Sequence, residues 1–305
     1  MSVLFLQRTR VARVSVPTVV ERYRGEVHAT YRYLRLAIIL LTVLLGCAVG
    51  IQVLGDGGTV LPSVSAYYYS PARAVFVSSL CAIGACMIVH RGRSDLEDVL
   101  LNFSGYLAFF VAFVPTPSVV IAGTDAAAQA PRDLTDAVSN NTGAILIVGL
   151  IAFVVEIFVV PRRERSFRGR AGRTAHVASA IAFAGLGVFF LVARDEFIQR
   201  AHTIAAAGLF IGIVGVVGVN GVALARAARE RGESRRAQVW NRYTIGFLVM
   251  IGSVVAVVTV ARPMVAQWVF VLETALIAQF LLFWIVQTVE RWRVPEPPQD
   301  DLVPG

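Results

Sequence analysis

The side chains of this sequence that could do chemistry are polar groups at the edges of long apolar segments. Ionisable groups inside such segments are costly, so each one is a candidate functional residue. A guanidinium, an imidazole, a carboxylate, two hydroxyls and a phenol are expected near the same end of three segments. These candidate ligand-binding residues are Ser63, Ser65, Tyr67, Arg73, His202 and Glu273.

Arg73 is expected in the first turn of a helix, because Ser70 and Pro71 suit the N-cap and the first helical position. A cation at that end opposes the helix dipole, so it needs an anionic partner. Glu273 lies about a turn and a half inside another apolar segment and is the carboxylate expected to pair with it. A lipid phosphate and a bound ligand are the alternative partners, and a structural clasp is the alternative role for a pair of Arg73 with Glu273.

His202 begins an apolar segment and could be a general base, a ligand contact or a helix cap. Catalysis would need a reacting group within hydrogen-bond reach, for which Ser63 and Ser65 are the candidates. No nucleophile motif surrounds either serine. We therefore predict a binding site without catalytic residues. Tyr67 and the two tyrosines after it either contact the ligand or form an aromatic belt at the head-group level.

A second set of polar groups is expected near the opposite ends of the segments. Ser94 with Glu97 predicts a capping box at the start of one segment. Asp98 and Asn102 are four residues apart and share a helix face. We interpret most of this set as polar groups at helix ends: His90, Asp98, Asn102, Glu156, His176 and Asn220.

Standard metal, cofactor and nucleotide motifs are missing from the sequence. It contains no HExxH, no pair of CxxC motifs, no GxSxG, no phosphate-binding loop and no GxGxxG. Cys86 and His90 have helical spacing, but two ligands without a third and fourth make a poor zinc site. The three cysteines lie inside apolar segments, so no disulfide framework is expected. We predict neither a metal site nor a cofactor.

The composition is that of an integral membrane protein. Of the 305 residues 56% are apolar and 16% are charged, whereas about a quarter of a soluble domain is charged. A membrane-spanning helix needs about 20 apolar residues. Eight segments meet this requirement and predict an all-α, polytopic helix bundle: 34–54, 72–90, 98–114, 143–160, 176–193, 202–225, 243–260 and 268–289.

The arginines predict how the bundle is oriented. Residues 1–33 form an Arg-rich arm, 34–289 the transmembrane bundle and 290–305 a tail. With eight spans, 23 of the 28 arginines fall on one side, which the positive-inside rule places in the cytoplasm together with both termini. Cations spread over every inner loop indicate contacts with anionic membrane lipids rather than with nucleic acid. The absence of lysine is typical of a GC-rich bacterial genome, so we expect a multi-pass protein of the bacterial inner membrane.

Two predicted helices contain small residues at packing spacing. Gly46 and Gly50 form a GxxxG motif, and the segment 202–225 has a stripe made of Ala205, Gly208, Gly212 and Gly215. Small residues let helix backbones approach closely in lipid. We expect these positions to pack inside the bundle; the alternative is a seam between two copies of the chain in a homo-oligomer.

One short region resembles known membrane-protein families. Pro62-Ser63-Val64-Ser65, followed by Pro71 and Phe76, is similar to a P-x-[IV]-S…P…F pattern, and His202, Ala206 and Phe210 to a His-x-x-x-[AG]-x-x-x-F helix start. Both patterns resemble bacterial multipass membrane proteins of unknown function and the damage-regulated autophagy modulator family with its GPI-anchor-remodelling relatives. The resemblance covers about 25 residues of a chain with more spans than the six typical of those families. It implies a motif on the outer face that meets lipid head groups, and it does not establish an enzyme activity.

These observations favour a non-catalytic protein that binds or senses a lipid or another small amphiphile at an extracytoplasmic polar pocket. The pocket is expected between the segments that begin at residues 72, 202 and 268. A secondary transporter is the first alternative and would use Glu156 or Glu273 for coupling. A membrane lipid hydrolase or transferase that uses His202 is the second.

Cysteine substitutions at Gly123 and Ser166 test the predicted orientation. In a cysteine-free background, Gly123→Cys should react with a membrane-impermeant thiol reagent in intact cells, because it lies in a predicted outer loop. Ser166→Cys lies in an Arg-rich loop and should react only after lysis. Labelling of Ser166→Cys in intact cells would reverse the orientation.

Overall fold

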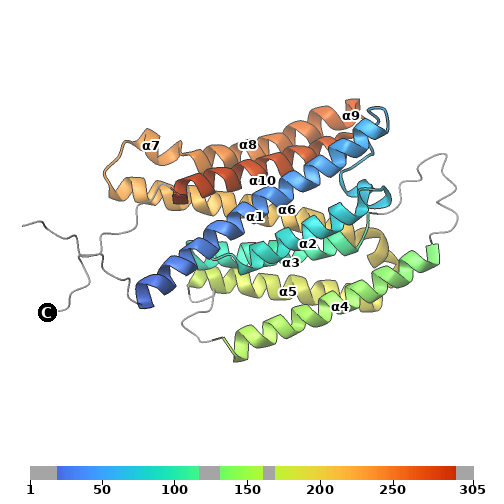
Figure 1. Cartoon of the computed structure of the whole chain (residues 1–305), viewed down its shortest axis with the longest axis horizontal. Helices are drawn as coiled ribbons and strands as arrows, with labels where there is room; N and C mark the ends of the chain where they lie inside the picture. The colour runs from blue at the N-terminus through green and yellow to red at the C-terminus, as the bar shows by residue number, and fades with distance from the viewer. Residues whose placement is uncertain (1–18, 117–130, 161–168, 293–305) are drawn as a thin grey trace, which may run out of the picture.

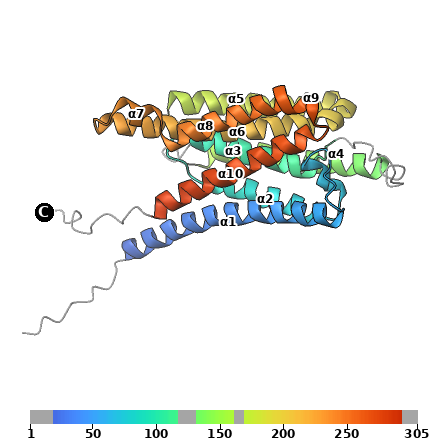
Figure 2. The ribbon, with the colours of Figure 1, turned by 90° about the horizontal axis from the view of Figure 1, so that it is seen from above.

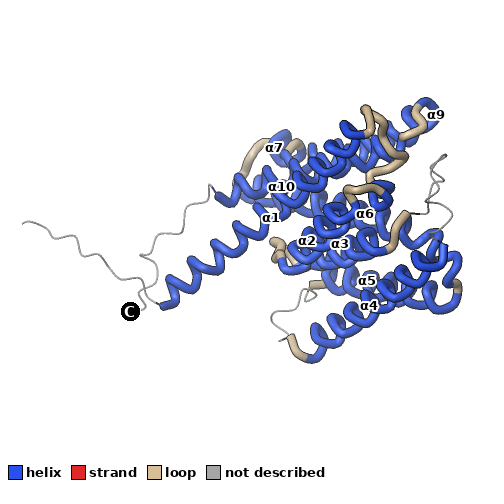
Figure 3. Tube along the Cα trace, turned by 45° about the vertical axis from the view of Figure 1, so that its right-hand side comes forward, coloured by secondary structure: helices blue, strands red, loops and turns tan. Residues whose placement is uncertain are grey.

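The computed structural model of the chain describes residues 19–116, 131–160 and 169–292. Within these ranges the regular secondary structure is entirely helical, with no β-strand (Figures 1 and 3). Seven helices are long and apolar enough to cross a membrane, as a multi-pass membrane protein requires. They are α1 (Val19–Gly55), α3 (Asp95–Phe113), α4 (Pro131–Phe158), α5 (Arg170–Val192), α6 (Arg194–Glu230), α8 (Arg242–Ala256) with its continuation to Met264, and α10 (Trp268–Trp292).

The remaining elements are short. Helix α2 (Arg73–Val89) is apolar and has 17 residues, so it is about 25 Å long at 1.5 Å per residue and falls just below the length of the other seven. It coincides with the predicted segment 72–90. A five-residue π-helical turn, η4 (Val257–Ala261), and α9 (Arg262–Met264) prolong α8, and α7 (Arg235–Val239) precedes it.

The sequence misplaced one boundary, and one helix begins earlier than the span predicted within it. Residues 194–201, predicted to be a turn, form the first turns of α6, and only Ala193 with its non-helical backbone separates α5 from α6. Helix α1 begins at Val19, so the second half of the predicted arm is helical. The first 18 residues, 117–130 of the predicted outer loop, 161–168 and the tail from 293 lie outside the described residues.

Helix α3 is the centre of the bundle. Its most extensive contacts are with α6 and α2. Of the most apolar stretch of α3, 61% is buried inside the protein, compared with 11% for α4 and 6% for α5. Figure 2 shows α1 and α2 on one side of α3, with α5, α6 and α8 on the other. The exposed faces of the outer helices are apolar, as Val148, Leu191 and Val192 illustrate. Such faces suit contact with lipid chains rather than with water.

Glycines let α2 and α3 approach each other closely. A Cβ atom on Gly84 of α2 would lie 2.6 Å from the Gly105 carbonyl oxygen of α3, and the reverse substitution gives the same distance. The stripe on α6 packs inside the bundle as predicted, with Gly212 against Ser104. Gly46 and Gly50 do not, because no neighbouring atom lies within 4 Å of their Cβ positions. The predicted intramolecular role of that GxxxG motif is therefore wrong.

The two kinds of glycine predict opposite effects of alanine. Gly84→Ala forces a methyl group against a backbone carbonyl, and overpacking of this kind costs about 1–3 kcal/mol of unfolding free energy. Gly46→Ala meets open space and should gain up to about 1 kcal/mol from helix propensity. Thermal unfolding of the purified variants in one detergent measures both. A stable Gly84→Ala protein would contradict the close α2–α3 contact.

Candidate functional site

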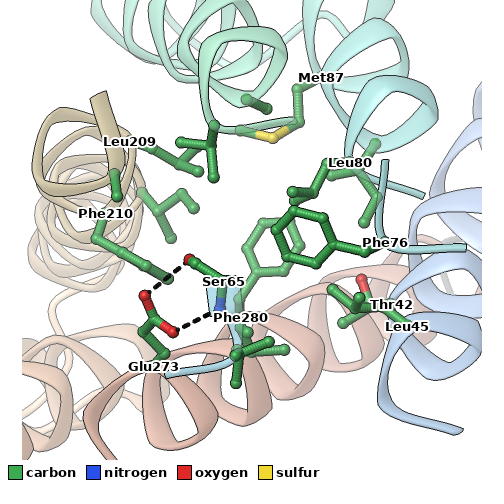
Figure 4. A pocket seen from close by; sticks show the side chains of 17 residues that line it. Thr42, Leu45, Ser65, Phe76, Leu80, Met87, Leu209, Phe210, Glu273 and Phe280 are labelled. Atoms are coloured by element: carbon green, nitrogen blue, oxygen red, sulfur yellow. Dashed lines mark hydrogen bonds between the residues drawn. The ribbon is translucent and has the colours of Figure 1, made fainter. Parts of the chain in front are cut away.

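The connection between α1 and α2 folds as a 3-10 helix, η1 (Ser65–Tyr69), and docks onto the start of α10. The Phe270 N–H, one of the donors that a helix leaves unsatisfied in its first turn, donates to the Pro62 carbonyl oxygen at 3.0 Å. Three residues on, Glu273 accepts two hydrogen bonds from Ser65, one from the backbone N–H at 3.1 Å and one from the hydroxyl at 3.0 Å (Figure 4). The first turns of α10 thus hold the connection in place.

Arg73 does not pair with Glu273, which corrects the expectation from the sequence. No ion pair within the described ranges joins them. The Arg73 guanidinium donates to the Tyr68 hydroxyl oxygen at 2.7 Å, and its carbon atom lies 4.3 Å from the centre of that ring. The negative face of an aromatic ring attracts a cation. Tyr68 is therefore the partner of Arg73 in place of the expected carboxylate, and Glu273 accepts its hydrogen bonds from Ser65 instead.

A cavity of about 60 Å³ lies between α1, α2, α3, α6 and α10 (Figure 4). Apolar side chains form most of its wall, among them Phe76, Met87, Leu209, Phe210 and Phe280. The polar lining consists of Thr42, whose hydroxyl donates to its own helix backbone at 2.7 Å, and of Ser65 with Glu273. The cavity is therefore an apolar space with a hydrogen-bonded carboxylate in its lining.

Of the six candidate binding residues, Ser65 and Glu273 line this cavity and the other four do not. The Ser63 hydroxyl accepts a hydrogen bond from the Ala66 N–H at 3.0 Å and stabilises the start of η1. Tyr67 is fully buried, and its hydroxyl accepts from the Leu61 N–H at 3.4 Å. These two side chains shape the connection rather than the cavity.

His202 is buried on α6, with 3% of its surface exposed. Its Nδ1 lies 2.6 Å from the Val114 carbonyl oxygen, and a carbonyl only accepts, so Nδ1 donates the proton. Within the described chain Nε2 has no hydrogen-bond partner. The Ser63 and Ser65 hydroxyls bond elsewhere. Arg73 and His202 line none of the cavities described among the residues of the structure, so the polar pocket expected from Arg73, His202 and a tyrosine stays a prediction.

Tyr69 is the outermost residue of η1. Partial burial raises the pKa of its phenol to about 12, so the hydroxyl keeps its proton over the physiological range. It donates a hydrogen bond to the Thr116 carbonyl oxygen at 2.7 Å, just beyond the end of α3. This bond ties η1 to α3 in addition to α10.

At the opposite end of the bundle, Glu97 joins three elements. The Ser94 hydroxyl accepts from the Glu97 N–H at 3.2 Å, which is the first half of the predicted capping box. The Glu97 carboxylate does not return to Ser94; it accepts from the Arg93 N–H at 2.7 Å and from the Asn220 amide at 2.7 Å. Glu97 and Asn220 are almost fully buried. Glu97 therefore connects α3 to α6 as well as capping α3.

One buried arginine near this end was not singled out from the sequence. The Arg35 guanidinium of α1 lies 3.4 Å from His90 Nε2 and donates to the Gln287 carbonyl oxygen of α10 at 3.5 Å. The edge of the His90 ring meets Trp284, with ring centres 5.0 Å apart. An arginine just inside the first apolar segment was the signal that could have found this cluster.

Comparisons with known proteins give no match: no family model, no curated protein and no solved structure is similar to this chain. The site is therefore interpreted from its own geometry. Apolar walls can hold a hydrocarbon segment, and a few convergent polar groups can fix the orientation of a polar head. The Glu273 carboxylate has lone pairs beyond the two that Ser65 uses.

Glu273 and Arg73 should differ in their effect on stability. Glu273→Ala removes two acceptors and leaves the Ser65 N–H and hydroxyl unpaired, which costs about 1–3 kcal/mol of unfolding free energy. Arg73→Ala removes the contact between an exposed guanidinium and the buried Tyr68 ring, worth about 0.5–1 kcal/mol. Thermal unfolding in detergent ranks the two variants. An equal or larger loss for Arg73→Ala would support the ion pair instead.

Proposed function

We propose that this chain is an eight-span protein of the bacterial inner membrane, with both termini in the cytoplasm, and that it binds a single-chain amphiphile without catalysing a reaction. Helix α2 is the eighth span in this proposal. The observation that carries it is the apolar cavity with Glu273 and Ser65 in its lining, placed beside the connection between α1 and α2.

The size of the cavity favours a slender ligand. An engineered cavity of about 150 Å³ admits benzene, whereas this one has about 60 Å³. It therefore accommodates a segment of an alkyl chain rather than a ring. The walls are supplied by five helices, so a bound chain would touch most of the bundle. Binding of an amphiphile would in this way change the relative positions of the helices, which is how the protein would sense it.

The carboxylate selects the head of the ligand. Both Glu273 carboxyl oxygens act as acceptors toward Ser65 and have further lone pairs, so the ligand head should contribute hydroxyl or other donor groups. A head without donors would leave the carboxylate's remaining lone pairs unused and bind less tightly. The resemblance of residues 62–76 to a motif that meets lipid head groups agrees with a head at this position.

The hydrogen bonds around His202 favour binding over hydrolysis or group transfer. The candidate nucleophiles bond to partners other than the imidazole, with Ser65 donating to Glu273. His202 donates to a backbone carbonyl, as a residue that locks α6 to the end of α3 would. A transporter is not favoured by any particular contact in the described part of the chain.

Cavity-filling variants test the proposal. Native mass spectrometry of the protein with added monoolein should show a bound monoolein, and methyl oleate, which lacks donors, should bind more weakly. Ala206→Leu places a larger side chain in the cavity wall and should abolish the adduct, whereas Ala207→Leu on the exposed face of the same helix should not. Equal binding by both variants would place the lipid elsewhere.

Replacing the carboxylate tests the role of the head. Glu273→Gln keeps the size of the side chain but removes the ionised acceptor, so the preference for monoolein over methyl oleate should shrink. Retention of the full preference would show that Glu273 does not contact the head.

A further inference from the structure

A second cavity lies between α3, α4 and α5 and shares no lining residue with the first. Its volume is about 180 Å³, which exceeds the volume of about 150 Å³ that admits benzene in an engineered protein. It therefore has room for a compact ligand of six or seven heavy atoms. Neither the proposed amphiphile site nor its contacts with η1 account for this space.

Aromatic rings form one part of its wall. Phe103, Tyr106, Phe153 and Phe183 all line the cavity. Phe183 contacts two of the other rings: its ring centre is 5.7 Å from that of Tyr106 and 5.3 Å from that of Phe153. The Tyr106 hydroxyl donates to the Ile145 carbonyl oxygen at 2.9 Å, which fixes the ring across the gap between α3 and α4.

The polar part of the wall contains one carboxylate. Glu156 of α4 lines the cavity together with Asn102, His176 and Ser179. Within the described ranges Glu156 makes no hydrogen bond and no ion pair, and none of the described lining residues is an arginine. A half-buried carboxylate without a partner is costly in apolar surroundings. A bound cation would remove that cost.

We propose that this cavity binds a small organic cation, an alkylated ammonium group, between Glu156 and the aromatic rings. Rings attract a cation by their quadrupole, and clusters of them are the usual receptors for quaternary ammonium groups. The carboxylate adds the opposite charge. A metal ion is a poorer match, because no group of three or more His, Cys, Asp or Glu side chains among the described residues could hold one.

Choline and its neutral isostere 3,3-dimethylbutanol form the test pair, since they differ in one atom and in charge. Binding of radiolabelled choline to the full chain in nanodiscs of phosphatidylglycerol should be saturable. The neutral alcohol should compete at least about tenfold less well, as expected if electrostatic attraction supplies most of the affinity. No saturable choline binding, or equal competition by the alcohol, would overturn the proposal.

Variants assign the binding to this cavity. Glu156→Gln should weaken choline binding by about tenfold or more, and Phe153→Leu, which keeps the carboxylate, by about threefold. Glu230→Gln changes an exposed carboxylate at the end of α6 and should bind as the wild type does. Unchanged binding by Phe153→Leu, or by a folded Glu156→Gln protein, would refute the assignment. Phe153→Leu decides the matter if Glu156→Gln fails to fold.

The lipid composition of the nanodisc distinguishes the two sources of such a cation. If the occupant is the ammonium head of a membrane lipid, adding phosphatidylethanolamine to the nanodisc should suppress choline binding. If the occupant is a soluble amine, choline should bind equally well in both membranes. Either result supports an ammonium site and names its source.

Discussion

The pair of hydrogen bonds from Ser65 to Glu273 is the interaction on which the proposed site depends. A carboxylate within a span has no water to bond, so the protein must supply its partners. Here the partners come from the connection between α1 and α2, which the Phe270 N–H also holds through Pro62. The same bonds fix the connection against α10 and place a carboxyl group beside an apolar cavity. The fold and the proposed binding site therefore depend on the same contact.

The opposite end of the bundle follows the same rule with different residues. Glu97 is buried, and each of its carboxylate oxygens accepts a hydrogen bond, one from the backbone after α2 and one from Asn220 of α6. At that end Glu97 thereby ties α3 to α6 and caps its own helix, while Gly84 and Gly105 let α2 approach α3 closely farther along. Helices α4 and α5 are less buried and border the second cavity.

The positions of the spans could be predicted from the sequence, because apolar length alone sets them: the predicted segment 268–289 lies within α10, and 98–114 nearly coincides with α3. The turn predicted at 194–201 failed because α6 continues beyond the apolar zone, and polar composition does not distinguish a loop from a protruding helix. The sequence also placed Arg73 and Glu273 near the same ends of their helices. A position along a helix does not, however, tell which neighbour a side chain points toward. Tyr68, five residues before Arg73, is an alternative partner for the guanidinium. Only the folded η1 shows that Arg73 bonds to Tyr68 rather than to Glu273.

The central claim is that an amphiphile occupies the apolar cavity with its head at Glu273. A cryo-electron microscopy structure of the protein in lipid nanodiscs tests this most directly. The account predicts chain-shaped density between α1, α2, α6 and α10 that ends within about 3 Å of the Glu273 carboxylate. A cavity filled by the protein's own side chains, with Glu273 paired to Arg73 and no lipid between the helices, would contradict it.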